Sequence, residues 1–403
     1  MQFDFNFYSS LLLITFSQGL IYSFLLLKKG IQTENKSNYW LSLFVLLCSL
    51  YVAPWMLGFA GWYDNQPYRN FMFYMPFQHL FYVGPVIYFY TQSLLNPLFK
   101  FKKKEFLHLF PGLIYLIYSF LIYFYDCVIA DDIYFYSNGM DKDFDQWYQI
   151  SGQISMLFYF IVCLKYYSNY KKLVVEITSN ANELLFAWIK NYLIAFLIML
   201  LLPVVFDLTA LFFPEIKSYQ GSWWFYLLFS FVLYYIAITG YGNNTITKIG
   251  FQFKYHEQNL VYYLTENTTS GIIFDNVIDI KHEVVGDIED ENLYRWKNAI
   301  EDLIVSESLY KNSELSLIDI AKKLQTNVAV ISKTVNQGFR MNFNDFINNY
   351  RIEAVKEMFA IGAHKKSTLL GIAYDCGFNS KATFNRAFKK STGFAPKEYL
   401  LKF

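Results

Sequence analysis

The sequence predicts an all-α fold in which a seven-helix transmembrane bundle is followed by a cytoplasmic double helix-turn-helix domain. The chain of 403 residues is 55% hydrophobic and only 17% charged. Its apolar residues gather in blocks long enough to cross roughly 30 Å of hydrocarbon as helices. The carboxyl-terminal part instead repeats a helix, turn, helix pattern twice. We therefore expect a membrane domain over residues 1–240, a connector over 241–310 and the helix-turn-helix domain over 311–403.

Charged or polar breaks separate seven apolar blocks, which predict the seven spans. The spans run from about Tyr8 to Leu27, Tyr39 to Phe59, Phe71 to Leu95, Phe106 to Ala130, Trp147 to Tyr167, Tyr192 to Phe213 and Trp223 to Gly240. Prolines inside the blocks predict kinks, at Pro54, Pro76, Pro85 and Pro203. The first block lacks a basic segment before it and a cleavage site after it, so we expect it to be retained rather than removed as a signal peptide.

The charges between the spans alternate in sign and predict the orientation of the bundle. Lysines follow the first and third spans and flank the loop after the fifth, at Lys28, Lys29, Lys36, Lys100, Lys102, Lys103, Lys104, Lys165, Lys171, Lys172 and Lys190. The loop after the fourth span carries Asp126, Asp131, Asp132, Asp141, Asp143 and Asp145 against Lys142 alone. Because lysine-rich loops stay in the cytoplasm, we expect a multi-pass protein of the inner membrane, with the amino terminus outside and the tail in the cytoplasm.

Polar side chains inside the spans are costly in hydrocarbon and mark candidate functional positions. Gln18 lies in the first span, Gln78 and His79 lie in the third, and Asp207 lies in the sixth. One interpretation is that these four residues line a pocket open to the outside, for an unknown small ligand or another membrane signal. The alternative is that they form hydrogen bonds between helices and only specify their packing.

The connector is acidic, with about 5 Lys or Arg against about 12 Asp or Glu from Tyr241 to Tyr310. Short apolar runs from Phe251 to Thr265 and from Ile272 to Ile280 predict strands or a small ordered patch. From Asp290 to Ser308 the pattern becomes helical, with one apolar stripe formed by Leu293, Trp296, Ile300, Leu303 and Ile304. This stripe either packs against the following domain or forms a coiled-coil homodimer. Fewer than three heptads are present, which favours packing.

Each helix-turn-helix unit has its own turn and start signals. The first unit is Leu317 to Leu324, the turn Gln325-Thr326-Asn327 and Val328 to Phe339; the second is Leu369 to Asp375, the turn Cys376-Gly377-Phe378-Asn379 and Ser380 to Ser391. Apolar residues recur at three and four spacings in each helix. Side chains able to cap the first turns are Ser316, Asn327, Asn342, Ser367 and Asn379. Gly377 suits the left-handed conformation of a sharp turn, after which Phe378 returns to the core.

At these residues the sequence resembles the AraC/XylS family of bacterial transcription regulators. The resemblance is carried by Ala321, Leu324, Ile331, Asn349-Tyr350-Arg351, the run from Ile372 to Ser380, Phe384, Phe388-Lys389-Lys390, Thr392-Gly393 and Pro396-Lys397-Glu398-Tyr399. Two departures concern helix ends: Arg340 stands where a glycine is common, and Ala395 where a capping threonine is usual. The membrane segment more loosely resembles the seven-span region of membrane-anchored AraC-type regulators, at Gly84-Pro85, Tyr88-Phe89-Tyr90 and His108-Leu109-Phe110-Pro111.

The resemblance implies that the second helix of each unit enters the major groove of double-stranded DNA. The groove-facing positions are then Ala329, Ser332 and Lys333 in the first reading helix and Lys381, Ala382, Thr383 and Arg386 in the second. Arg386 suits a guanine edge, whereas Lys333 or Lys381 suits a guanine edge or a phosphate. Arg351 is expected to hold the two units together. A basic helix face can also be merely solvated, but about 15 Lys or Arg against about 7 Asp or Glu from Lys311 to Phe403, about +8, favours DNA.

These expectations describe a membrane-bound one-component transcriptional regulator, whose sequence-specific DNA binding is controlled by a signal sensed in the membrane domain. The alternative is a membrane receptor or transporter whose helical tail binds a protein partner. We expect no enzyme activity and no cofactor, because the chain has no Walker loop and no nucleophile elbow. Its four cysteines form no CxxC pair, and the sequence shows no zinc-ligand spacing, so neither a metal site nor a disulfide framework is implied.

Overall fold

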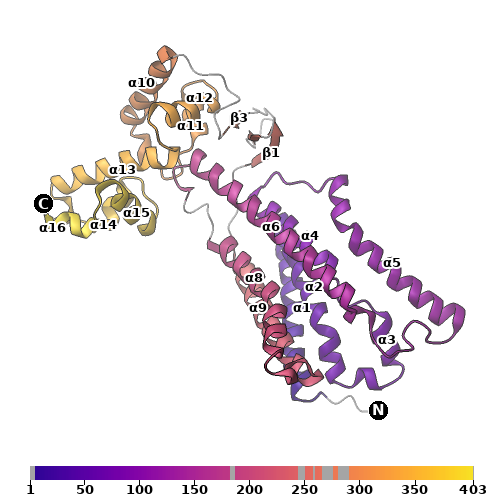
Figure 1. Cartoon of the computed structure of the whole chain (residues 1–403). Coiled ribbons are helices and arrows are strands. Elements are labelled where there is room, and N and C mark those ends of the chain that lie inside the picture. Colours follow the sequence, from indigo (N-terminus) through magenta and orange to yellow (C-terminus); the bar gives the residue numbers. More distant parts are fainter. Residues whose placement is uncertain are drawn as a thin grey trace. The chain divides into compact units, whose positions relative to one another are not determined.

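The computed structural model describes residues 5–181, 187–243, 250–256, 259–265, 276–279 and 290–402 (Figure 1). The chain forms two compact units. Unit 1 consists of Met1–Tyr167 and Ala187–Ile246, and unit 2 consists of Ser168–Phe186 and Thr247–Phe403. One helix, α6 (Gln146–Ile177), contributes residues to both units.

Unit 1 is a bundle of helices around α2. Its helices are α1 (Phe7–Thr33), α2 (Lys36–Phe59), α3 (Tyr68–Tyr74), α4 (Leu80–Leu95), α5 (Phe110–Phe124), the first part of α6, α8 (Ala187–Ala210) and α9 (Tyr219–Gly242). Shorter turns of helix are η1 (Trp62–Asp64), η2 (Lys103–Leu109), η3 (Tyr125–Ala130), η4 (Lys142–Phe144) and η5 (Pro214–Lys217). Helix α2 packs against α1, α4 and α9, which explains why it is the most buried long helix of the bundle.

The described part of the chain holds six helices that are long and apolar enough to cross a membrane. They correspond to six of the seven predicted spans. The third predicted span is instead divided into α3 and α4, with residues 75–79 between them not helical. Pro76 lies in this break, where its ring prevents a continuous helix, whereas Pro54, Pro85 and Pro203 lie inside α2, α4 and α8. The mainly helical fold class is thus confirmed, and the count of seven spans is approximate.

A buried carboxylate closes the break between α3 and α4. Asp143 accepts hydrogen bonds from the backbone N–H groups of Phe77 and Gln78, at 2.8 and 3.0 Å, and from the hydroxyl of Tyr115. These N–H groups precede α4 and have no partner within a helix, so the Asp143 carboxylate acts as a helix cap for α4. Gln78 is further fixed by Gln149, whose Nε2 lies 2.5 Å from Gln78 Oε1.

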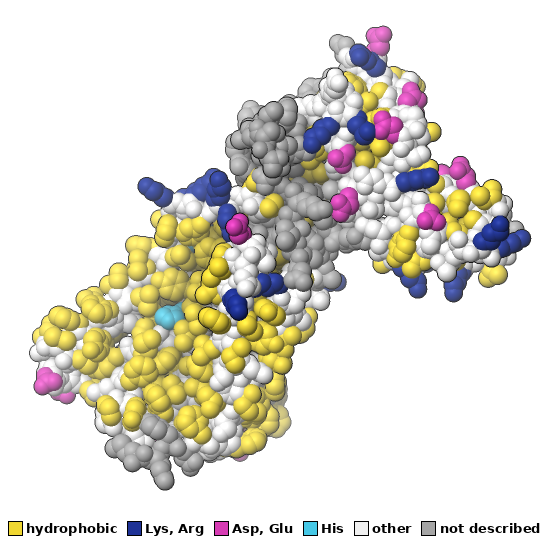
Figure 2. All heavy atoms as spheres, turned by 180° about the vertical axis from the view of Figure 1, so that it is seen from behind, with side chains coloured by type: hydrophobic (Ala, Val, Ile, Leu, Met, Phe, Trp, Pro, Cys, Tyr) yellow, Lys and Arg dark blue, Asp and Glu magenta, His cyan; other side chains and the backbone are white. Residues whose placement is uncertain are grey.

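The surface of unit 1 is unusually apolar. Figure 2 shows hydrophobic side chains over most of its visible face, whereas charged side chains are numerous on unit 2. The exposed apolar residues of α5 alone include Phe110, Leu113, Ile114, Ile117, Phe120, Leu121 and Phe124. A continuous apolar surface of this extent is typical of a protein that contacts lipid or another partner.

Unit 2 contains the helix-turn-helix region and a small sheet. Its helices are α10 (Asp290–Ser306), α11 (Leu317–Lys323), α12 (Val328–Lys333), α13 (Phe343–Ala360), α14 (Leu369–Asp375), α15 (Lys381–Thr392) and α16 (Pro396–Lys402), with η6 (Leu309–Lys311), η7 (Thr334–Gly338) and η8 (Ala363–Lys365) between them. Strands β1 (Gly250–His256), β2 (Asn259–Thr265) and β3 (Asn276–Asp279) form an antiparallel sheet in the order β1-β2-β3. The predicted strands are therefore present, except for residues 257–258, 272–275 and 280, which lie outside the described residues.

The predicted caps are found at or next to their expected positions. Asn327 and Asn342 cap α12 and α13, and Ser316 forms a capping box with Asp319 at the start of α11. The caps of α14 and α15 are Thr368 and Ser380, each one residue after the predicted Ser367 and Asn379. In each case the side-chain oxygen satisfies an N–H group of the first turn.

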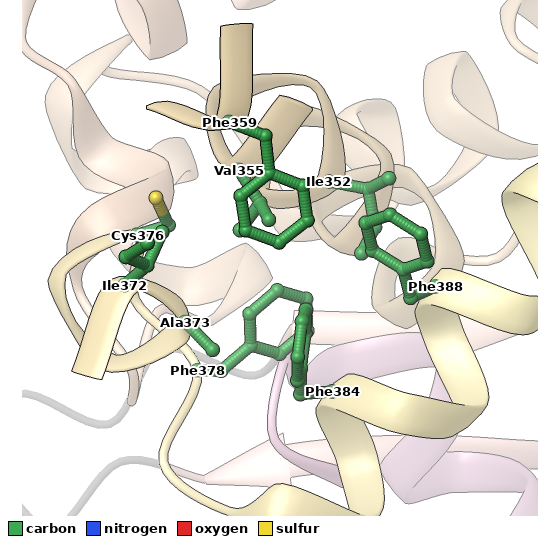
Figure 3. Close-up of a cluster of buried hydrophobic side chains, with 9 residues drawn as sticks. All are labelled: Ile352, Val355, Phe359, Ile372, Ala373, Cys376, Phe378, Phe384 and Phe388. Carbon is green, nitrogen blue, oxygen red and sulfur yellow. The ribbon is translucent and has the colours of Figure 1, made fainter. Parts of the chain in front are cut away.

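The second helix-turn-helix unit has its own core, formed by α13, α14 and α15. Figure 3 shows its buried side chains converging from these helices and the intervening turn: Ile352, Val355, Phe359, Ile372, Ala373, Cys376, Phe378, Phe384 and Phe388. Gly377 makes the turn possible, with φ at +94°. A β-carbon at this position would lie 2.3 Å from the carbonyl oxygen of Tyr310, so conformation and space both require glycine.

Helix α10 packs within unit 2, in agreement with the favoured interpretation of its apolar stripe. It contacts η6 and η7, and Ile300 and Ile304 are fully buried. At η7, Leu293 Cδ1 lies 3.7 Å from the position that a β-carbon of Gly338 would occupy. The stripe is therefore used inside the chain, and a homodimer stays a prediction without structural support from this helix.

Candidate nucleic-acid interface

The second reading helix, α15, presents basic side chains at its surface. Lys381, Ala382 and Arg386 are exposed, as expected for residues that contact a groove. Thr383 is 3% exposed, and its hydroxyl lies 2.9 Å from Ser380 Oγ. The structure therefore uses Thr383 to hold the start of α15, and three of the four predicted positions on this helix are accessible.

The first reading helix, α12, is covered by other parts of unit 2. Ser332 and Lys333 are 5% and 4% exposed, and Ala329 is half-buried. Strand β3 lies against α12, and Asn336 in the following turn donates a hydrogen bond of 3.0 Å to Glu176 of α6. In this conformation DNA has no access to Ser332 and Lys333, in contrast to Arg386 on the second reading helix.

The turn that follows α6 binds beside α11 and α13. Thr178 pairs with Ser316 in an isolated antiparallel bridge, and Ser179 N–H donates to the carbonyl of Leu315 at 3.0 Å. Asn344 on α13 donates through Nδ2 to the carbonyl oxygens of Thr178 and Ser179, at 3.4 and 2.8 Å. We call residues 178–180 the α6 turn. It binds to the first helix-turn-helix unit as an added piece of backbone, with its polar groups satisfied by hydrogen bonds.

Arg351 connects the α6 turn to the helix-turn-helix domain. Its side chain is 1% exposed, and its guanidinium donates to the carbonyl oxygens of Tyr310 and Asn312, at 2.7 and 2.8 Å, and to Ser179. The bonds to Ser179 reach the carbonyl oxygen at 3.3 Å and Oγ at 2.9 Å. Burial lowers the pKa of Arg351 to about 10, so the group stays charged near neutral pH.

The position of Arg351 agrees with its predicted role and adds to it. Its guanidinium carbon lies 5.8 Å from the ring centroid of Phe378, in the turn of the second helix-turn-helix unit. The side chain therefore joins the two helix-turn-helix units within unit 2. The α6 turn as a third partner was not predicted. The only sequence signal for this contact is the charged Arg351 beside apolar residues on a predicted helix. This signal does not identify the residues that Arg351 contacts.

The four residues of the predicted signal pocket have different surroundings. Gln78 is fully buried in the hydrogen bonds described above, and Gln18 and His79 are half-buried. Asp207 has 69% of its side chain exposed and forms an ion pair of 3.0 Å with Lys217. None of the four lines either of two cavities that the structure shows in unit 1. The surroundings of Gln78 favour the packing interpretation for that residue.

The carboxyl-terminal part of the chain matches a known domain family. Residues 320–402 match the family model described as a helix-turn-helix domain, which covers both helix-turn-helix units from within α11 to within α16. The carboxyl end of the chain is thus an AraC-type helix-turn-helix domain. No solved structure matches the chain.

Curated relatives match only part of this chain. An uncharacterized HTH-type transcriptional regulator of Staphylococcus aureus strain COL is 31% identical over 91 residues, which is 23% of this chain and 12% of the relative. Uncharacterized HTH-type transcriptional regulators of strains MSSA476 and N315 match with the same identity and coverage. The chain thus covers about an eighth of the length of these relatives.

Proposed function

We propose that this protein is a membrane-bound one-component transcriptional regulator, in which unit 1 senses a signal in the inner membrane and unit 2 binds specific DNA in the cytoplasm. The observation that carries the proposal is the combination of an AraC-type helix-turn-helix domain with six helices able to cross a membrane in one chain. The lysine-rich loops support a cytoplasmic location for unit 2.

The contacts of α6 support a route for control. This helix belongs to unit 1 up to Tyr167 and to unit 2 from Ser168 onward, and the α6 turn binds Arg351 and Asn344. A signal that favours another position of α6 would change the free energy of these contacts. Such differential contacts are what a ligand needs to shift an equilibrium between two states. In the proposed inactive state, the cover over α12 leaves only the second reading helix accessible.

The test is selection of DNA from a random pool by the full chain in lipid nanodiscs, at two salt concentrations. The full chain is needed because the α6 turn forms part of the helix-turn-helix domain. We expect a recurring site that one or both reading helices contact, with half-elements about one helical turn apart when both helices bind. Retention should weaken steeply as salt rises. Retention without any sequence preference would contradict the proposal and favour a tail that binds a protein partner.

Arg386 is the residue to vary in this experiment. We expect Arg386→Ala to weaken binding to the selected site by about 1–3 kcal/mol, with little change on random DNA, because a guanine edge is read by a bidentate arginine. Arg295→Ala is the matched control, since it removes an exposed arginine from α10, outside both reading helices. An equal loss on selected and random DNA would show that Arg386 does not read bases.

A further inference from the structure

A large cavity lies at one end of unit 1, among loops that the charge pattern places outside the membrane. Its volume is about 620 Å³, which is in the range of cavities that hold small organic ligands. Its lining comes from the end of α2 and from all three predicted outer loops, and includes Trp55, Phe144, Tyr219, Asp64, Arg69 and Asp145. A molecule bound here would contact segments that precede α3, α6 and α9.

Aromatic rings form much of the wall, and they hold each other in place. The rings of Trp55 and Tyr219 are stacked, with centroids 5.2 Å apart and planes at 25°. Phe144 meets Trp55 edge to face at 5.8 Å, and Tyr226 stacks on Trp55 at 4.8 Å. These contacts between the rings hold the aromatic wall in place.

The charged groups of the lining are unbalanced. Asp64, Asp141 and Asp145 face one arginine, Arg69. No described lysine, arginine or histidine forms an ion pair with any of these three carboxyl groups. Arg69 itself donates through Nε to the carbonyl oxygen of Tyr63 at 2.7 Å. The cavity therefore has an excess of acidic groups beside aromatic side chains.

The three aspartates of the lining differ in their burial and in their hydrogen bonds to the protein. Asp141 is buried and accepts hydrogen bonds from Tyr63 Oη at 2.8 Å and from Asp143 N–H at 2.9 Å. Asp145 is half-buried, with one oxygen 3.2 Å from Trp147 Nε1, and Asp64 is exposed. Asp64 and Asp145 are thus the carboxylates best placed to meet a charged ligand, while Asp141 belongs to the frame of the cavity.

The carboxylates that line the cavity suit an organic cation better than a metal ion. A metal ion such as Ca²⁺ needs six to eight oxygen ligands gathered around one point, and the described residues include no cluster of three or more acidic, histidine or cysteine side chains suited to metal. Carboxylates spread around an aromatic wall instead fit a cation whose charge sits on an apolar body, because the carboxylates balance the charge while the rings bury the carbon atoms.

We propose that this outer cavity binds an organic cation, an ammonium group carried on an apolar body of drug-like size. The inference rests on the proposed function in one respect only: bound cation would be the signal that unit 1 senses. Binding between the loops before α3, α6 and α9 then favours one arrangement of these helices over another. The site differs from the pocket predicted at Gln18, Gln78, His79 and Asp207, none of which lines it.

The test measures binding of three probes with the same aromatic body to the full chain in lipid nanodiscs, by ligand-observed saturation-transfer NMR. The probes are benzyltrimethylammonium, the neutral 2-phenylethanol and the anionic phenylacetate. We expect saturable binding of benzyltrimethylammonium that is about tenfold tighter than that of either other probe. Equal binding of the three probes, or uptake of the cation without saturation, would overturn the proposal.

Charge variants locate the site. Asp64→Asn together with Asp145→Asn should weaken benzyltrimethylammonium binding by about tenfold, whereas Asp132→Asn, an exposed aspartate of the same outer loop outside the cavity, should leave it unchanged. Arg69→Gln should tighten it by about threefold, because it removes the one cation of the lining. If the double variant fails to fold, the affinity of the Arg69→Gln protein for benzyltrimethylammonium tests the site by itself. Unchanged affinity in Arg69→Gln and in a folded double variant would overturn the site.

The same samples separate the cation site from the regulator. DNA selection by the full chain is measured with and without benzyltrimethylammonium. Saturable, variant-sensitive cation binding without sequence-specific DNA binding would support the cavity and contradict the proposed function. Specific DNA binding by a chain that shows no cation preference would support the regulator and overturn the cavity as an organic-cation site.

Discussion

Single residues in this chain act by joining segments that are far apart in sequence. Arg351 is the clearest case, because it satisfies backbone carbonyl groups from the stretch before α11 and from the α6 turn. A buried guanidinium is costly to desolvate, and these hydrogen bonds offset that cost. Its partners are carbonyl oxygens and a hydroxyl, so the group stabilises the arrangement of backbone segments and not a pair of opposite charges.

Removing the Arg351 side chain should loosen unit 2. We expect Arg351→Ala to lower the free energy of opening of α13 by about 3 kcal/mol, because several buried carbonyl groups lose their donor. The measurement is hydrogen exchange of the α13 amides in the full chain. Lys356→Ala on the same helix is the control, since Lys356 pairs with the exposed Glu353 and should change exchange by less than about 0.5 kcal/mol. Similar exchange in both variants would contradict the role of Arg351.

Asp141 makes the stability of unit 1 depend on pH. Burial raises the pKa of Asp141 to about 8, from 3.8 in the unfolded chain, and the neighbouring Asp143 adds to the rise. Between these two values the folded state holds a proton that the unfolded state has lost, so folding stability is greatest at low pH and falls as pH rises through this window.

The expected observation is a melting temperature of unit 1 that decreases from about pH 4 to about pH 8. Asp141→Asn should make this decrease smaller, because asparagine has no proton to lose. Asp132→Asn, at an exposed position of the same loop, is the control and should keep the full decrease. A pH dependence that is identical in the two variants would argue against proton retention at Asp141.

Among the elements, α6 has the largest consequence for function. It is 32 residues long, longer than the roughly 20 residues that cross a bilayer, and its last ten residues belong to unit 2. The α6 turn then binds beside α11 and α13. The element that would cross the membrane is thus also bound to the helix-turn-helix domain.

Locking the α6 turn should hold the protein in its covered state. Thr178 and Ser316 are paired across an antiparallel bridge, a spacing that suits a disulfide. We expect the oxidised Thr178→Cys, Ser316→Cys protein to bind its selected DNA site about tenfold more weakly than the reduced protein, with recovery after reduction. Each single cysteine variant is a control and should not respond to oxidation. Equal binding by the oxidised and reduced double variant would contradict control through this turn.

At the scale of the whole molecule, the distribution of charge and apolar surface defines the proposed orientation. Exposed apolar side chains cover α5 and much of α8 in unit 1, and lysines occupy the loops predicted to be cytoplasmic. The net charge of the whole chain is only +1, so the orientation depends on where the charges lie and not on their sum.

Cysteine labelling in intact cells checks this orientation. In a Cys127→Ser background, which removes the exposed native thiol, Asp132→Cys should react with an impermeant maleimide. Lys102→Cys should react only after the membrane is permeabilised, because it follows the third predicted span. The buried thiols Cys48, Cys163 and Cys376 provide the background reaction. Labelling of Lys102→Cys in intact cells would reverse the proposed topology.

The helical class, most of the apolar helices and the double helix-turn-helix could be predicted from the amino-acid sequence. Asn327, Asn342 and Gly377 were recognisable because each acts on backbone within a few residues of itself. The predicted caps at Ser367 and Asn379 were one residue early, since the adjacent Thr368 and Ser380 compete for the same role. Periodicity, caps and turns are local, and the sequence displays them directly.

The contacts between distant segments, in contrast, could be seen only in the folded chain. Arg351 and Ser179 are 172 positions apart, and nothing in either neighbourhood specifies the other. The division of the third span depends on Asp143, which satisfies N–H groups more than sixty residues earlier. The cover over α12 and the outer cavity likewise depend on packing between surfaces that have many compatible partners in sequence. Hydrophobic burial is not directional, so the shape of the assembled core selects among them.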